Sequence, residues 1–303
     1  MRLQWHHSIT VIMLLVAASA NDAVAQSALS HPCQRIHQDY VVKERQLEGR
    51  QLHFLLFDAA EHGCLDMLEM LLDKGASVHA RDRGGNTAFL LAARAGKRKA
   101  IKLLQDRGSD VHRRNLHGST ALLLATEANR GGAVKLLLDY DIDPRIANKR
   151  GVTPLMAAAF NGNAKILKTL LSAGAETQGL DMTGKSALIY ASARGFSKVV
   201  SLLLDAGADV NGRGGNDLTP LIWAAGHSND VPETEAIKTI DLLVARGADL
   251  DSRDNKGKTA LITAAKRGHT RIVDRLIELG ADTFLKDRKG RTASDWAKLQ
   301  SEP

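Results

Sequence analysis

The chain has 303 residues, of which 44% are hydrophobic, and 41 Lys and Arg outnumber 34 Asp and Glu to give a net charge of +7. Only 4% of the residues are aromatic, whereas 26 are glycine. This composition excludes one large aromatic-rich core and favours many short helices separated by frequent turns.

The first 25 residues are predicted to form a secretory signal peptide. Arg2 precedes an uncharged, mostly apolar run from Ile9 to Ala18, and small residues then offer cleavage sites after Ala20 and after Ala25, of which the second is favoured. An uncleaved membrane anchor is the alternative, but the run is shorter than the roughly 20 residues that span a bilayer. We therefore expect a periplasmic or secreted protein that has no stable membrane insertion after cleavage.

Two cysteines, Cys33 and Cys64, remain after residue 25. An even number of cysteines in an exported chain predicts a disulfide, with two unpaired thiols as the alternative. Cys33 lies in residues 26–51, which we interpret as an irregular N-terminal arm or cap, and Cys64 follows the turn glycine Gly63. A Cys33–Cys64 bond would fasten this arm to the first repeat.

A hydroxyl residue recurs every 33 residues along the chain, with one interval of 40 that marks an insertion of seven residues. Each is followed by Ala or Pro, then usually by Leu, with Ala at the fifth position after it, so it is expected to start and cap a short helix. Glycine ends this helix, a second apolar helix follows, and an extended loop leads to the next unit. The recurring residues are Thr87, Thr120, Thr153, Ser186, Thr219, Thr259 and Thr292.

The period, the pattern Gly-x-Thr-Pro-Leu-x-x-Ala-Ala and the sequence Gly-Ala-Asp-Val-Asn at 207–211 resemble the ankyrin repeat. The resemblance implies an all-α solenoid of helix-turn-helix units with projecting hairpin loops, about seven repeats plus a C-terminal half-repeat. Where the family often has His after Thr-Pro-Leu, this chain has apolar residues such as Met156, so packing must replace that hydrogen bonding. The repeat domain, residues 52–303, divides into 52–81, 82–114, 115–147, 148–180, 181–213, 214–253, 254–286 and a cap at 287–303.

The insertion falls at residues 228–236, is acidic and contains Pro232. It is interpreted either as an additional partner-contact loop or as a tolerated surface insertion, because long surface loops cost little free energy.

Motifs with known chemistry do not indicate an enzyme. Gly179 to Ser186 matches the phosphate-binding loop pattern, but Gly184 and Ser186 have equivalents 33 residues away, so the match is attributed to the repeat. The histidines lack zinc-ligand spacing, and neither cysteine lies in a catalytic signature. We expect no catalytic residues, no cofactor and no metal.

Charge at the partner-facing positions implied by the ankyrin resemblance is strongly positive. Glu127 is the only acid there, and Phe160 and Tyr140 are the candidate apolar anchors. Ordinary solvation of exposed loops in a basic protein is the alternative, but the acids lie elsewhere, on the backs of helices, so the basic concave face is expected to bind an anionic protein. The basic residues are Arg83, Arg94, Arg107, Lys149, Arg150, Lys185, Arg194, Arg246, Lys256, Lys258, Lys266, Arg267, Arg288, Lys289 and Arg291.

These observations predict a monomeric, non-catalytic protein-binding scaffold in the cell envelope, which protects, regulates or inhibits an envelope enzyme or a toxin. Nucleic acid is not expected as a partner, because the chain is exported and few aromatic residues stand at these positions. A secreted effector acting on host proteins and an enzyme with a dispersed active site are the alternatives.

Overall fold

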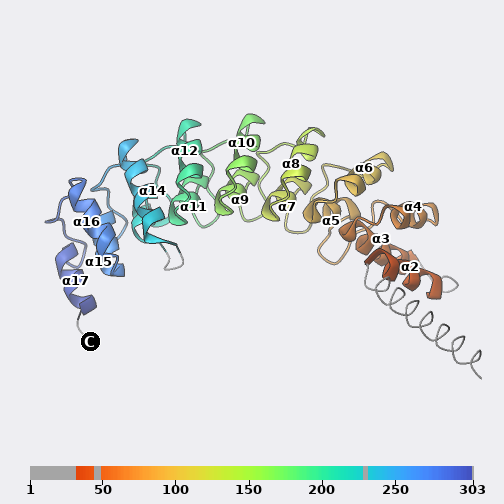
Figure 1. The fold of residues 1–303 in the computed structure, drawn as a ribbon, viewed down its shortest axis with the longest axis horizontal. Coiled ribbons are helices and arrows are strands. Elements are labelled where there is room, and N and C mark those ends of the chain that lie inside the picture. Colours follow the sequence, from red (N-terminus) through yellow and green to blue (C-terminus); the bar gives the residue numbers. More distant parts are fainter. Residues whose placement is uncertain (1–31, 44–48, 228–230, 302–303) are drawn as a thin grey trace, which may run out of the picture. The chain divides into compact units, whose positions relative to one another are not determined.

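A computed structural model describes residues 32–43, 49–227 and 231–301, in which the regular elements are helices and no strand occurs (Figure 1). The chain divides into two compact units, residues 1–110 and 111–303. The predicted signal peptide and its cleavage site lie outside the described residues. Among the described helices, none is long and apolar enough to cross a membrane.

Unit 1 contains five described helices, α2 (Pro32–Lys43), α3 (Gly49–His62), α4 (Leu65–Asp73), α5 (Ala88–Ala95) and α6 (Arg98–Asp106). α3 packs against both α4 and α5, and α4 packs against α6. Each repeat thus contributes a first helix and a second helix. First helices of neighbouring repeats lie side by side, and so do second helices. α3 runs through Phe54, the position equivalent to Thr87, because no hydroxyl residue there starts a new helix.

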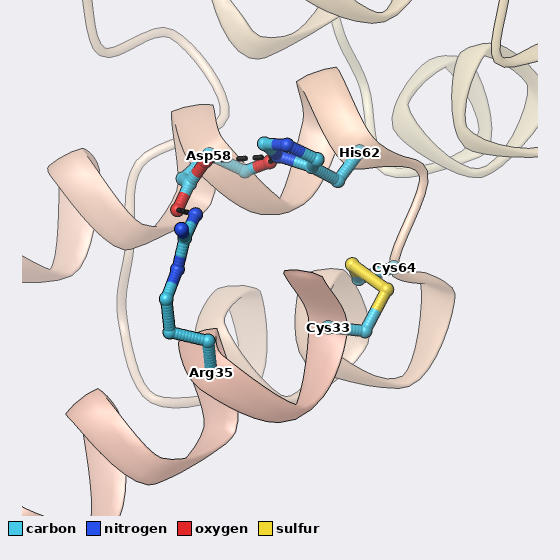
Figure 2. The surroundings of a disulfide bond; sticks show 5 residues. All are labelled: Cys33, Arg35, Asp58, His62 and Cys64. Carbon is cyan, nitrogen blue, oxygen red and sulfur yellow. Dashed lines mark hydrogen bonds and ion pairs between the residues drawn. A yellow bond between two sulfur atoms is a disulfide. The ribbon is translucent and has the colours of Figure 1, made fainter. Parts of the chain in front are cut away.

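The predicted disulfide is confirmed. Cys33 and Cys64 are bonded, with their Cα atoms 5.4 Å apart, and Figure 2 shows the bond beside the ion pair of Arg35 with Asp58. The prediction of an irregular arm around Cys33 is wrong, since this segment forms α2 and packs on α3 and α4. The reason is a helical spacing of four between the buried residues Ile36 and Tyr40.

Unit 2 continues the alternation of first and second helices, which form two rows in Figure 1. Its first helices are α7 (Ala121–Glu127), α9 (Pro154–Phe160), α11 (Ala187–Ala193), α13 (Pro220–Ala225), α15 (Ala260–Arg267) and α17 (Ala293–Ser301). Its second helices are α8 (Gly131–Leu138), α10 (Ala164–Ser172), α12 (Ser197–Asp205), α14 (Glu233–Ala245) and α16 (Thr270–Glu278).

The predicted caps explain where the first helices begin. The hydroxyl of Thr153 accepts a hydrogen bond from the Met156 amide at 3.3 Å, and the hydroxyls of the other six recurring residues, from Thr87 to Thr292, do the same. The apolar residue in the position where the family often has His is buried in each of the first helices α5, α7, α9, α11, α13 and α15. Small alanines such as Ala158, fully buried, let neighbouring first helices pack closely.

Two helix ends that lack glycine still adopt the left-handed conformation. Asn129 (φ 61°) and Asp141 (φ 55°) occupy the positions of Gly162 and Gly174 in the next repeat. Asn and Asp tolerate this conformation better than other side chains, so the turns are conserved in form without glycine.

The predicted insertion lengthens a helix. α14 has 13 residues, whereas α12 and α16 have nine each. Pro232 stands just ahead of α14, and Val231 is buried close to Gly195. Residues 228–230 are outside the described part of the chain.

Candidate partner-binding face

Hairpin turns precede the first helices, and most are organised by an Asp or Asn three residues before a glycine; the turn before α13 differs, with Gly214 and Asp217 at these two positions. In one of them, Asp181 Oδ1 accepts hydrogen bonds from the amides of Thr183 at 2.8 Å and Lys185 at 2.9 Å. The side chain therefore points into the turn, and the following side chains point outward. Asn115, Asn148, Asp254 and Asp287 have the same role in unit 2.

Neighbouring hairpins of unit 2 are joined by backbone hydrogen bonds. The Lys149 amide donates to the His117 carbonyl and the Arg288 amide donates to the Lys256 carbonyl, each at 2.9 Å. Gly184 has φ +73°, and a Cβ there would lie 2.3 Å from the Gly215 nitrogen, so this position requires glycine. We call the surface formed by these hairpins and by the exposed sides of α9, α11, α13, α15 and α17 the hairpin face.

Two hairpin carboxylates are buried beneath this face and remain ionised. Burial opposes ionisation of Asp181, but hydrogen bonds from Tyr190, Lys185 and Thr183 outweigh it and lower its pKa. The pKa of Asp287 is likewise lowered, because backbone amides and the Trp296 indole N–H donate to it against the effect of burial. Burial and the contact with Asp181 raise the pKa of Tyr190 to about 12.

Aromatic side chains of the first helices lie beside outward-pointing cations. The Arg194 guanidinium lies 4.7 Å from the Phe160 ring centroid, and the Lys185 Nζ lies 5.3 Å from that of Trp223. Phe160 and Tyr190 contact each other edge to face with centroids 5.7 Å apart. We call these five residues the Tyr190 cluster.

A hollow of about 290 Å³ lies against the Tyr190 cluster. Phe160, Tyr190 and Met156 are part of its lining, together with Arg150 and Glu127. Burial raises the pKa of Glu127, while the positive charges of Arg150 and His117 act in the opposite direction. The hollow thus has largely apolar walls and charged groups at its margin, which is the usual composition of a side-chain binding pocket.

A second group of cations surrounds Trp296. The distances from its ring centroid are 5.7 Å to Lys258 Nζ, 5.2 Å to Lys266 Nζ and 4.8 Å to the Arg291 guanidinium carbon. We call these four residues the Trp296 cluster.

Comparison with protein families accounts for the repeated architecture. A family described as ankyrin repeats (3 copies) matches residues 12–115, 56–148, 89–181 and 133–214, ankyrin repeats (many copies) match 243–297, and the single ankyrin repeat matches 216–255. The chain belongs to the ankyrin-repeat family. Ankyrin repeats serve as protein-binding scaffolds and are generally not catalytic. A search of curated proteins finds no match.

The ankyrin hairpins place most of the predicted basic residues of unit 2 on one surface. Lys149, Arg150, Lys256, Arg288 and Lys289 are exposed in the hairpins, and Lys266 and Arg267 are exposed at the end of α15. Tyr140 instead lies in the turn after α8, away from Phe160 on α9.

Other predicted basic residues are already paired with acids of the preceding ankyrin repeat. The distances are 2.9 Å from Arg94 to Glu61, 2.8 Å from Arg107 to Asp73 and 2.8 Å from Arg246 to Asp205. Arg83, in unit 1, lines an open hollow of about 960 Å³ that also contains Phe54.

Sequence reasoning missed the aromatic part of the hairpin face. Tyr190, Trp223 and Trp296 each follow the helix-starting hydroxyl by four residues, a position that is not among the partner-facing positions implied by the ankyrin resemblance. The detectable pattern was the combination of an aromatic residue at this position with a cation directly before the hydroxyl, as in Lys185 and Arg291.

The motifs with known chemistry have structural roles in the ankyrin fold. Gly179 to Ser186 leads through a hairpin turn into α11, where Ser186 caps the helix and Lys185 Nζ contacts Thr183 Oγ1 at 2.9 Å. In the searched, described residues, no group of three or more His, Cys, Asp and Glu is placed to hold a metal ion.

Proposed function

We propose that this ankyrin-repeat protein is an exported, non-catalytic scaffold whose hairpin face binds an acidic protein. In the cell envelope such binding would protect, regulate or inhibit an enzyme or a toxin. The predicted signal peptide supports export, and the Cys33–Cys64 disulfide is in keeping with an oxidising compartment.

The observation that carries this proposal is the unbalanced charge of the hairpin face. Its basic side chains form no ion pair with any described residue, whereas Arg107 and Arg246 at the ends of second helices are paired. The hairpin carboxylates Asp181, Asp254 and Asp287 keep their charge while they accept backbone hydrogen bonds inside the turns, but they are far fewer than the basic side chains and offset only part of the positive charge. The unpaired basic residues are Lys149, Arg150, Lys185, Arg194, Lys256, Lys258, Lys266, Arg267, Arg288, Lys289 and Arg291.

The hollow beside the Tyr190 cluster supplies a place for an apolar anchor of the partner. Phe160 is 46% exposed, so burying its ring in a complex would remove apolar surface from water. Arg150 at the edge of the hollow would contact an acidic residue next to that anchor. Buried apolar anchors supply most of the affinity of an interface, while charges around them set the association rate and the choice of partner.

Capture of partners from the envelope fraction of the source cells tests this function. The oxidised protein should retain an acidic protein at low salt and release it as salt is raised. The variant Lys149→Glu/Arg150→Glu should lose capture. The variant Lys165→Glu/Lys168→Glu changes net charge equally on exposed positions of α10 and should retain it.

Equal loss of capture by both variants would show that overall charge, not the hairpin face, binds the partner. A partner that stays bound at high salt and is insensitive to Lys149→Glu/Arg150→Glu would contradict the proposal. Turnover of a substrate by the protein alone would favour the enzymatic alternative.

A further inference from the structure

The Trp296 cluster brings cations from three separate elements to one point. Lys258 and Arg291 come from two successive hairpins and Lys266 from the last turn of α15. The indole N–H of Trp296 donates to Asp287 Oδ2 at 3.0 Å, which fixes the ring in position. The ring is therefore a fixed platform around which the three cations gather.

The protein offsets the positive charges within this cluster only in part. None of its three cations forms an ion pair with a described residue, and Asp287, the nearest buried acid, is already bonded to the Lys289 and Arg291 amides and to Trp296. Burial and the neighbouring Lys266 ammonium lower the pKa of Lys258. The indole attracts the cations through its ring electrons but carries no charge to balance them.

The surroundings of the cluster add to its positive potential. Lys256, Arg267, Arg288 and Lys289 are exposed nearby on the same hairpins and on the end of α15. Asp254, the acid of the first of these hairpins, accepts the Lys256 and Lys258 amides at 2.8 Å. A ligand with at least two negative charges close together would therefore find several N–H donors without displacing a carboxylate.

Accordingly, we propose that the Trp296 cluster binds adjacent carboxylates of an acidic peptide segment in the partner. This inference rests on the proposed function and specifies which residues recognise the acidic sequence. Single-stranded nucleic acid fits less well, because it would need an open aromatic ring for base stacking, and three cations already lie against this ring.

Tryptophan fluorescence provides a local test. In a Trp5→Phe/Trp223→Phe background of the oxidised protein, Trp296 is the remaining tryptophan. Titration with an end-blocked hexaglutamate peptide should change its emission, because the cations move from the ring toward the carboxylates, and hexaglutamine should not. In the same background, Lys258→Ala/Lys266→Ala should raise the dissociation constant for hexaglutamate by about tenfold or more.

Controls separate the site from general charge effects. Lys165→Ala/Lys168→Ala removes the same charge from α10 and should leave the dissociation constant within about twofold. Lys266→Arg should preserve binding, and circular dichroism should show that all variants remain folded. For the weakened variants, the change should be confirmed by calorimetry, which does not depend on the indole.

Three results would overturn the proposal: no response to hexaglutamate, an equal loss in both double-alanine variants, or binding of tripolyphosphate at least as tight as hexaglutamate. If hexaglutamate binding fails while capture still depends on Lys149 and Arg150, the proposed function stands and only the Trp296 site is refuted. If hexaglutamate binding depends on the cluster but no protein is captured, the site stands and the proposed function fails.

Discussion

Removal of the Cys33–Cys64 disulfide should strongly destabilise unit 1. The two cysteines are 31 residues apart, and the loop-closure entropy for that length is worth about 3.7 kcal/mol at 25 °C. Cys64 is also 96% buried, so Cys33→Ala/Cys64→Ala removes a small amount of packing in addition. We therefore expect the double variant to lose about 3 to 4 kcal/mol of unfolding free energy, chiefly in the segment that holds α2.

Urea unfolding followed by circular dichroism measures this loss, and hydrogen exchange locates it. Amides of α2 and α3 should exchange faster in the variant, while those of α15 and α16, in unit 2, should keep their protection because repeats contact only their neighbours. Unchanged protection of α2 would refute the reasoning. So would two reactive thiols in the denatured, non-reduced natural protein.

Three further predictions concern the repeats themselves. Burial lowers the pKa of His269 below that of the unfolded chain, so the unfolding free energy should decrease as the pH is lowered from 7.5 to 5.5. His269→Gln should make this decrease smaller, and an equal decrease in both proteins would contradict the prediction. Gly184→Ala should lower the unfolding free energy by about 2 kcal/mol or more in thermal unfolding, because the added Cβ would collide with the next hairpin. Gly174 has the same left-handed backbone but open space around it, so Gly174→Ala should lower the unfolding free energy by about 1 kcal/mol. Equal losses would show that the contact with the next hairpin is unimportant. In ultraviolet titration Tyr190 should ionise near pH 12, and a normal phenol titration assigned to it by Tyr190→Phe would exclude its bond to a buried carboxylate.

Much of the fold was predictable because the same pattern recurs every 33 residues, so each copy shows where the helices of the others begin and end. The hydroxyl caps and the glycine turns recur at fixed intervals, and the structure places them at helix boundaries as expected. α2 was not predicted, because a single short helix outside the repeat has no second copy with which to compare it. The left-handed Asn129 and Asp141 were missed because only glycine was sought at those turns.

The candidate site was predictable only in part. Basic residues could be assigned to partner-facing positions, but whether each charge is free depends on its neighbours in space. Opposite charges 33 or 34 residues apart, such as Glu61 with Arg94 and Asp73 with Arg107, meet across adjacent repeats and form ion pairs. A hairpin cation can likewise contact the aromatic residue of the next repeat, as Lys258 contacts Trp296. This contact could not be predicted without knowing how neighbouring repeats pack.

The turns themselves explain why the hairpin face can be so positive, and Asp254 makes this testable. Asn115 and Asn148 organise their hairpins with the same two backbone hydrogen bonds that Asp254 accepts, so a turn needs the oxygen and not its charge. Asp254→Asn should therefore leave the unfolding free energy within about 0.5 kcal/mol and tighten binding of hexaglutamate at low salt. Asp287→Asn should instead loosen the Trp296 cluster, because the second oxygen of Asp287 accepts the indole N–H and an amide nitrogen could not. Weaker hexaglutamate binding by Asp254→Asn would mean that the acid orders the cations rather than merely offsetting them.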